Sequence, residues 1–197
     1  SIYIVSTIFL LGVILYIYYK NETKMLEETC SMELNNASMH IKTEIMNKYM
    51  RAAFSEALKA YKLGEVPVGC VIEKDGEIIG RGHNLVEKSK LATGHAEIIA
   101  IEQACRNTGS WRLAGSNIYI TLEPCIMCTG AILHARINNI HIGALDPVRG
   151  GAISRVPVIA EELIPGSNML IIEESRACSY ILSRFFRNLR IKKEKNK

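Results

Sequence analysis

The chain has 197 residues, of which 48% are hydrophobic and 22% charged, and its formal net charge at pH 7 is +4. This length exceeds one compact domain of about 100 to 150 residues by a short extension. The sequence has no internal repeat and no low-complexity tract, which excludes repeat arrays and compositionally biased chains. Its six cysteines lack the spacing of a disulfide framework and favour a reducing compartment.

The N-terminal extension begins with an uncharged apolar run over residues 2–19. About 17 to 25 apolar residues are enough to cross a bilayer as a helix, so residues 1–20 are predicted to form a transmembrane anchor. Lys20 and Lys24 follow the run, which predicts that the rest of the chain lies on the cytoplasmic face and argues against a cleaved signal peptide. A buried helix or strand of a larger core is the alternative. Residues 21–45 are polar and mixed in charge, and are predicted to be a stalk.

Residues 46–197 carry the alternating helix and strand pattern of one α/β domain. Apolar residues recur at helical spacing over residues 50–61, which predicts a helix that ends near Gly64. Predicted strands over 68–73 and 77–82 flank an Asp75-Gly76 turn, a strong hairpin signal. The other expected elements are a helix from His95 toward Gly109, a strand over 117–122, a helix beginning near Cys125 and a strand over 139–144. Strands that alternate with helices predict a sheet covered by helices.

Three residues have the types and spacing of a zinc site that is open to solvent. His95 is followed thirty positions later by Cys125, and Cys128 stands one helical turn beyond it, so both sulfurs face the same side. Pro124 suits the first turn of that helix, whose N-terminus stabilises thiolates. Three protein ligands leave the fourth position of a zinc ion for water, which is the arrangement of a catalytic site. Glu97, close to His95, is predicted to be the catalytic proton carrier.

Other uses of the cysteines fit the pattern less well. A redox function of Cys125 and Cys128 would leave His95 and Glu97 without a purpose. Cys105 could close a four-ligand structural site, but it lies further along the predicted helix, roughly 15 Å from His95, and is predicted to belong to the core. A zinc-stabilised binding module without catalysis is disfavoured because Glu97 is present.

The His-x-Glu and Pro-Cys-x-x-Cys signature resembles that of the zinc-dependent base deaminases. The strings at residues 65–69, 111–113 and 121–125 are similar to those of one branch, the bacterial tRNA-specific adenosine deaminases, and the resemblance runs from about residue 46 to 190. It implies a cytidine-deaminase-like three-layer α/β fold, in which helices flank a central mixed sheet. It also implies a homodimer, one Zn²⁺ per subunit and hydrolytic conversion of the wobble adenosine of tRNA to inosine.

The same resemblance implies which residues bind the substrate. By it, Asn84 contacts the target nucleoside and Asp146 contacts the anticodon loop of the tRNA. Phe185, Phe186 and Arg187 are expected to bind RNA near the C-terminus.

The segment after the zinc motif departs from this family. Residues 151–155 differ from the family's pattern, and Pro157 interrupts what is commonly a helix, so a remodelled loop is predicted. The altered segment 153–170 favours the alternative function, a deaminase of a free nucleobase, a nucleoside or a related small molecule, which would keep the same zinc motif.

The C-terminus is strongly basic. From Arg184 to Lys197 the chain has seven Lys or Arg residues and one Glu. A basic C-terminal helix is predicted, and it is a candidate for contact with RNA phosphates. A terminal helix that is only solvated is the alternative.

Overall fold

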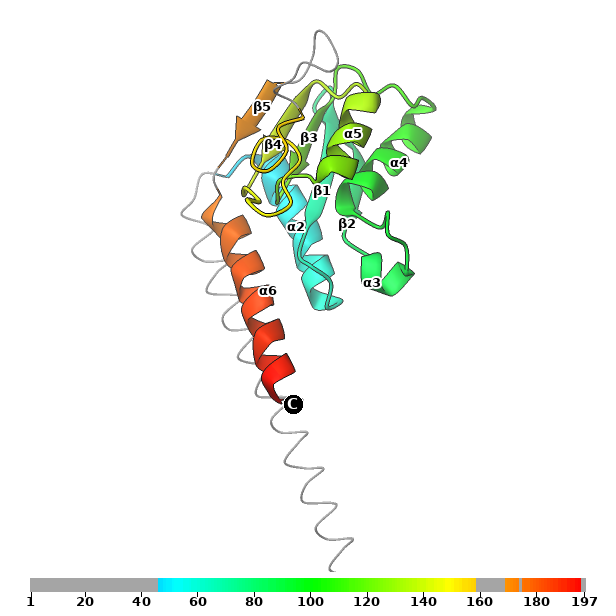
Figure 1. Cartoon of the computed structure of the whole chain (residues 1–197). Coiled ribbons are helices and arrows are strands. Elements are labelled where there is room, and N and C mark those ends of the chain that lie inside the picture. The colour runs from blue at the N-terminus through cyan, green and yellow to red at the C-terminus, as the bar shows by residue number, and fades with distance from the viewer. Residues whose placement is uncertain (1–45, 159–168, 174, 196–197) are drawn as a thin grey trace, which may run out of the picture. The chain divides into compact units, whose positions relative to one another are not determined.

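The computed structural model describes residues 46–158, 169–173 and 175–195. In this part of the chain a mixed sheet has five strands in the order β2-β1-β3-β4-β5 (Figure 1). β1 is antiparallel to β2 and to β3, whereas β3, β4 and β5 run parallel. The strands are β1 (Gly69–Lys74), β2 (Glu77–His83), β3 (Asn117–Ile120), β4 (Asn139–Ile142) and β5 (Met169–Ile172).

Helices cover both faces of the sheet, which gives the expected three layers. The helices are α2 (Lys48–Lys62), α3 (Val86–Ser89), α4 (Ala96–Thr108), α5 (Ile126–His134) and α6 (Arg176–Lys195). Tyr61 of α2 contacts Phe185 of α6, their ring centroids 6.0 Å apart, so these two helices share one face. α4 and α5 lie on the other face. The predicted mixed sheet flanked by helices is therefore confirmed.

The hairpin at the edge of the sheet forms where its turn chemistry predicted. Asp75 and Gly76 both have positive φ, 53° and 89°, the conformation of a tight turn whose twist matches that of the flanking strands. The helix before the hairpin also ends as expected, because Leu63 caps α2 and Gly64 follows with φ of 76°.

The core on the α4 and α5 face is built from the parallel strands. Ile118 and Ile120 of β3 and Ile140 and Ile142 of β4 are fully buried. Burial of each such side chain contributes roughly 1.5 to 3 kcal/mol. Since β3 and β4 are parallel, their carboxyl ends meet at one edge of the sheet, which is where α/β proteins place their sites.

Two elements were not predicted from the sequence. α3 is a single short turn between β2 and α4, and β5 completes the sheet beyond β4. Residues 151–158, where a remodelled loop was predicted, contain turns and bends and no helix.

The expected fold included an N-terminal transmembrane helix, and this part of the prediction is corrected. No helix within residues 46–158, 169–173 and 175–195 has the length and hydropathy needed to cross a bilayer. α6 is 20 residues long, but its sequence contains Arg187, Arg190 and Lys192, and charges within hydrocarbon are costly. The predicted anchor and the predicted stalk lie outside the described residues.

The close contact between α4 and β2 depends on Gly80, which has no side chain. A Cβ atom there would collide with the carbonyl oxygen of Ala100 and lie 2.9 Å from Cβ of Ala104. We predict that Gly80→Ala destabilises the protein by about 1 to 3 kcal/mol, because α4 would have to move off the sheet. Thermal unfolding measures this loss.

Gly130→Ala is the matched control. Gly130 lies in α5 with nothing within 4 Å of an added Cβ, so this substitution should stabilise the helix by up to about 1 kcal/mol. Equal melting temperatures for the two variants would show that the close approach of α4 to β2 is not required.

Candidate metal centre

Two helix N-termini meet at the centre of the predicted site. His95 is the N-cap of α4 and Cys125 the N-cap of α5, and both have extended backbone, with ψ of 148° and 172°. Neither side chain caps its own helix. Cys128 lies in the first turn of α5. The sequence placed these residues at helix starts, and the structure shows that two of them are the caps.

The three predicted ligands converge on one point. Nδ1 of His95 is 3.7 Å from Sγ of Cys125 and 3.5 Å from Sγ of Cys128. Zinc bonds of about 2.3 Å to sulfur and 2.0 to 2.1 Å to nitrogen, at a tetrahedral angle, would separate the donor atoms by about 3.6 Å. The three donor atoms all lie within 4.8 Å of one another. This donor set fits one zinc ion.

The exposure of the three ligands leaves one side of the site open. Cys128 is buried, whereas His95 and Cys125 are only partly buried. A closed structural zinc site has four protein ligands. Among the described residues, this cluster offers three, His95, Cys125 and Cys128, so the arrangement is that of an open site.

The two sulfurs differ in their affinity for a proton. A hydrogen bond from Cys128 lowers the pKa of Cys125 to about 4, against the opposing effect of burial. The same hydrogen bond, together with burial, raises the pKa of Cys128. A hydrogen bond to Cys125 raises the pKa of His95. The thiolate of Cys125 is thus already favoured, and a bound zinc ion would favour both thiolates.

Glu97 is the only predicted catalytic residue and lies next to the sulfurs. It is 3% exposed, in the first turn of α4, and interacts with the thiol of Cys128. Burial raises the pKa of Glu97 to about 6, and its backbone hydrogen bond and His95 limit the rise. A carboxyl group with a pKa near neutrality can both accept and return a proton.

Asn84, the predicted nucleoside contact, is held in place by Glu65. Nδ2 of Asn84 donates to Oε2 of Glu65 at 3.3 Å, and the buried carboxylate also accepts from the backbone N–H groups of Glu87 (3.2 Å) and Lys88 (2.7 Å). These bonds join the end of β2 to the first turn of α3. Because Glu65 takes the amide nitrogen, the amide oxygen of Asn84 remains for another donor.

Glu123 holds the loop that follows β4 against the metal centre. Its carboxylate accepts from the backbone N–H groups of Asp146 (3.0 Å), Ile153 (2.8 Å) and Ser154 (2.8 Å), and from the Ser154 hydroxyl. Burial alone would raise the pKa of Glu123, but these hydrogen bonds outweigh it and lower the pKa.

Two glycines let this loop lie on the start of α5. A Cβ atom on Gly150 would collide with the Glu123 carboxylate, and one on Gly151 would lie 2.6 Å from the carbonyl carbon of Cys125. The N–H of Gly151 donates to Pro124 O at 2.8 Å. Glu123 belongs to the motif at residues 121–125, which contributed to the family resemblance. Its hydrogen-bond partners are distant in sequence, and no signal in the sequence identified them.

The predicted RNA contacts are spread over two regions. Oδ1 of Asp146 accepts from the backbone N–H groups of Val148 (2.9 Å) and Arg149 (3.0 Å), so this residue shapes the turn after β4. On α6, Phe185 is 7% exposed and packs against Tyr61. Phe186 is 44% exposed and Arg187 is exposed, so these two side chains are accessible to RNA.

The family follows from this geometry together with comparison to known proteins. Residues 43–144 match the model of the cytidine and deoxycytidylate deaminase zinc-binding region. The chain therefore belongs to the zinc-binding cytidine and deoxycytidylate deaminase family, within which its predicted resemblance to the tRNA-specific adenosine deaminases is confirmed. Zinc as the cofactor and hydrolytic deamination as the class of reaction are confirmed as well.

Individual relatives resemble the chain over most of their own length. The tRNA-specific adenosine deaminase of Bacillus subtilis (strain 168) is 42% identical over 149 residues, which are 74% of this chain and 91% of that protein. A solved structure from work on tRNA:A34 deaminases, which edit A to I at the wobble position, is 36% identical with a TM-score of 0.65, covering 68% of this chain and 98% of that one. The guanine deaminase of Bacillus subtilis is 33% identical with a TM-score of 0.50, covering 66% and 82%.

The zinc site can be tested by metal content. We predict that the purified chain holds one zinc ion, and that Cys128→Ser loses it because one of three protein ligands is removed. Elemental analysis after dialysis measures the ratio of zinc to protein.

Cys105→Ser is the matched control, since Cys105 lies in α4 and is not a member of the cluster. It should retain the wild-type amount of zinc. Full zinc content in Cys128→Ser would contradict the ligand assignment.

Proposed function

We propose that this chain hydrolyses the wobble adenosine of tRNA to inosine and ammonia. The observation that carries the proposal is the convergence of His95, Cys125 and Cys128 beside a buried carboxylate, in a chain 42% identical to a tRNA-specific adenosine deaminase. The relative is matched over 91% of its length, so the comparison covers nearly all of that protein.

His95, Cys125 and Cys128 would hold the zinc ion, one in each subunit. When bound, zinc lowers the pKa of water and makes it a nucleophile at neutral pH. Two of these residues, His95 and Cys125, cap helix N-termini and are partly buried, whereas Cys128 is buried, so solvent would reach the ion from the side of His95 and Cys125.

Glu97 would move the protons of the reaction. Its carboxylate would take one proton from the attacking water and deliver it to the ring nitrogen. It would then take the proton of the hydroxyl group now bonded to the ring carbon and deliver it to the amine, which leaves as ammonia while the ring carbon keeps the oxygen. Burial suits it to both steps because it raises the pKa of Glu97 to about 6, closer to neutrality than that of an exposed carboxyl group.

Asn84 would bind the flipped-out adenosine through its amide. Glu65 is one accepting partner of this amide's nitrogen and fixes the side chain's orientation, so Asn84 needs no rearrangement on binding. Asp146, in the turn beside Glu123, would contact the anticodon loop at the rim of the site.

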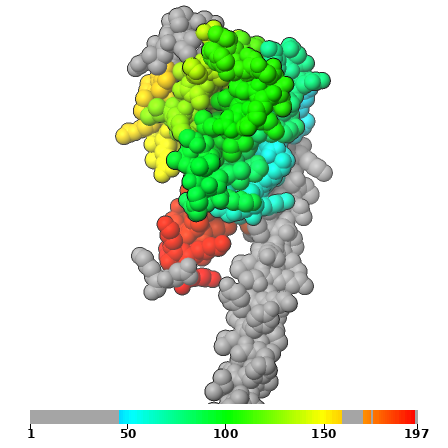
Figure 2. Space-filling model, turned by 90° about the vertical axis from the view of Figure 1, so that its right-hand side faces the viewer, coloured from blue at the N-terminus to red at the C-terminus, as the bar shows by residue number. Residues whose placement is uncertain are grey.

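α6 would provide further contacts to RNA. Phe186 and Arg187 are accessible for stacking and for phosphate contact, whereas Phe185 supports them by packing on α2. The last turns of α6 project beyond the sheet and carry Lys192 and Lys193 (Figures 1 and 2). Lysines and arginines in such a position neutralise phosphates without reading sequence. We propose that the enzyme acts in the cytoplasm, as its tRNA substrate implies.

We further propose that the enzyme is a homodimer. Ile126 and Met127, which follow the zinc ligand Cys125 in the first turn of α5, are 54% and 38% exposed, and Val148 in the neighbouring loop is 74% exposed. Apolar side chains gathered on one surface favour association. A second copy of the chain on this surface would lie at the edge of the RNA site.

Deamination of a free nucleobase is the alternative function. The similarity to a guanine deaminase and the altered sequence of residues 153–170 favour it. It is not favoured, because the tRNA-specific relatives are more similar in sequence and in structure.

The role of Glu97 can be separated from zinc binding. We predict that Glu97→Gln keeps zinc and lowers the deamination rate by between about 100-fold and 10,000-fold, because an amide of the same shape cannot carry the proton. Release of ammonia and zinc content are measured on the same preparation. Glu102→Gln, which changes an exposed carboxylate of α4 bonded to Arg106, should keep full activity. Unchanged turnover in Glu97→Gln would refute the proton-transfer role.

The substrate class can be decided by direct comparison. We predict that the enzyme forms inosine in an anticodon stem-loop with adenosine at the wobble position, and not from free adenosine, adenine, guanine or cytosine, because contacts on α6 and at Asp146 require RNA. Chromatography of digested products measures inosine directly. Turnover of the free compounds alone would replace the tRNA proposal with the alternative.

A further inference from the structure

A buried carboxylate on α2 takes no part in the proposed chemistry. Glu56 is 3% exposed, and three basic side chains converge on it. Its Oε1 atom is 2.8 Å from Nζ of Lys59 and 3.7 Å from Nη1 of Arg81. Its Oε2 atom is 3.2 Å from Nδ1 of His83. Such partners offset the cost of burying a charge. One of them, His83, directly precedes Asn84, the proposed nucleoside contact.

The two oxygens of Glu56 have different partners. The side chains of Lys59 and Arg81 are 55% and 46% exposed, so water can replace Oε1 as their partner. The side chain of His83 is only 24% exposed, and Oε2 is its partner in the structure. A carboxylate can only accept a hydrogen bond, so Nδ1 of His83 is the donor. The bond to Oε2 therefore fixes the imidazole ring and, through it, the end of β2.

The backbone of α2 lies directly against the strand that pairs with His83. Gly69 of β1 is opposite His83 of β2, at the end of the ladder between these strands. A Cβ atom on Gly69 would lie 2.9 Å from the carbonyl carbon of Glu56. α2 thus touches β1 through its backbone, and the side chain of Glu56 joins the same helix to β2.

Asn84 has few other supports. Its backbone N–H donates to Val68 O at 3.0 Å, and its amide nitrogen donates to Glu65 at 3.3 Å. Glu65 lies three residues beyond the end of α2. Both side chains that anchor this segment, Glu56 through His83 and Glu65 through the amide of Asn84, are therefore attached to α2. The position of Asn84 depends on that helix.

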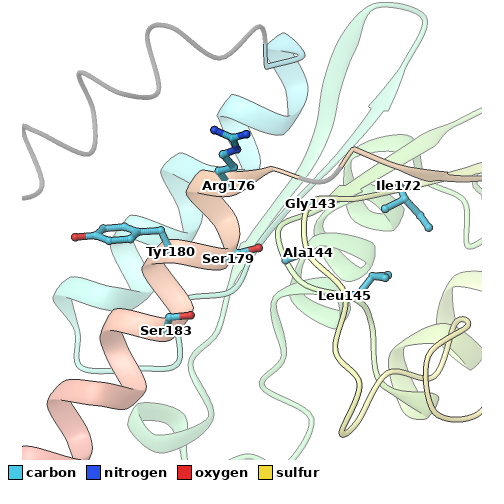
Figure 3. A pocket seen from close by; sticks show the side chains of 8 residues that line it. All are labelled: Gly143, Ala144, Leu145, Ile172, Arg176, Ser179, Tyr180 and Ser183. Carbon is cyan, nitrogen blue, oxygen red and sulfur yellow. The ribbon is translucent and has the colours of Figure 1, made fainter.

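The hollow that Figure 3 shows is a separate feature of the molecule. It has a volume of about 610 Å³ and lies between the ends of β4 and β5 and the first half of α6 (Figure 3). Glu56 and His83 belong to α2 and β2, and neither lines it. Substitutions at these two residues therefore test the contact between α2 and β2 and leave the lining of the hollow unchanged.

We infer that Glu56 is a positioning residue for substrate binding, which holds Asn84 in place for the target nucleoside through its hydrogen bond to His83. This inference rests on the proposed function. A binding group that is displaced by about 1 Å can cost roughly 100-fold in rate, so a contact behind the site has a measurable effect on turnover.

The test is a double-mutant cycle of Glu56→Met and Asn84→Ala, with deamination of an anticodon stem-loop as the measurement. Methionine keeps the length of the side chain and removes both acceptors, and an apolar replacement of a buried ion is often neutral for stability. Asn84→Ala should lower kcat/KM by roughly 10- to 100-fold and Glu56→Met by roughly 3- to 30-fold. The double variant should lose no more than Asn84→Ala alone, whereas a merely structural loss would multiply. Zinc content and melting temperature are measured on each variant.

Lys59→Gln is the matched control, because it removes a partner of Oε1 and leaves the bond between Oε2 and His83. It should keep the wild-type kcat/KM. If thermal unfolding shows Glu56→Met to be poorly folded, His83→Leu enters the same cycle with the same expected result. In that variant Glu56 keeps Lys59 and Arg81 as partners.

The outcomes separate the two proposals. Losses from Glu56→Met and Asn84→Ala that multiply, or a wild-type kcat/KM in Glu56→Met, would overturn the positioning role and leave the deaminase function intact. A wild-type kcat/KM in Asn84→Ala would overturn the nucleoside contact and the positioning role together. Failure of the wild-type enzyme on every stem-loop would overturn the proposed substrate, and the cycle is then decided on the free base that is turned over.

Discussion

The site depends on the close packing of two helix N-termini at one edge of the sheet. α4 lies on β2 where glycines leave room for its backbone, since a Cβ atom on Gly82 would collide with the carbonyl oxygen of Ala96. The loop after β4 lies equally close to the start of α5, through Gly151. The caps of both helices are therefore positioned by backbone contacts. His95 and Cys125 face each other because their backbones are fixed, and their short side chains need little further ordering.

Three of the buried carboxyl groups, those of Glu65, Glu97 and Glu123, have different environments. Glu65 and Glu123 each accept from several N–H groups, which compensates for their burial and anchors loops that carry Asn84 and Asp146. Glu97 is as deeply buried, but its pKa is raised to about 6. The raised pKa of Glu97 suits it to exchange a proton, which is what a hydrolytic deaminase requires of one carboxyl group.

Much of the fold could be predicted because its signals are local. The Asp75-Gly76 turn, the helical spacing over α2 and the helix starts at His95 and Cys125 are each encoded within a few residues. β5 was missed because it is a short strand whose stability comes from pairing with β4. The transmembrane helix was inferred from hydropathy alone, and the fold of the described residues contains none.

The parts of the candidate site that are encoded locally in the sequence could also be predicted. The ligands and Glu97 stand in short motifs, and the structure brings them together. The functions of Glu65 and Glu123 could not be predicted, because their hydrogen-bond partners lie 19 to 31 residues away in sequence. Phe185 and Phe186 are neighbours in sequence, but Phe185 packs against Tyr61 of α2. The sequence could not predict this difference, because it depends on how α6 packs against α2.

The account rests on a zinc ion held by one nitrogen and two sulfurs with one position left open, and X-ray absorption at the zinc edge measures this directly. The account predicts two sulfur neighbours at about 2.3 Å and two nitrogen or oxygen neighbours at about 2.0 to 2.2 Å. A spectrum that requires four protein ligands, or one without sulfur neighbours, would contradict it.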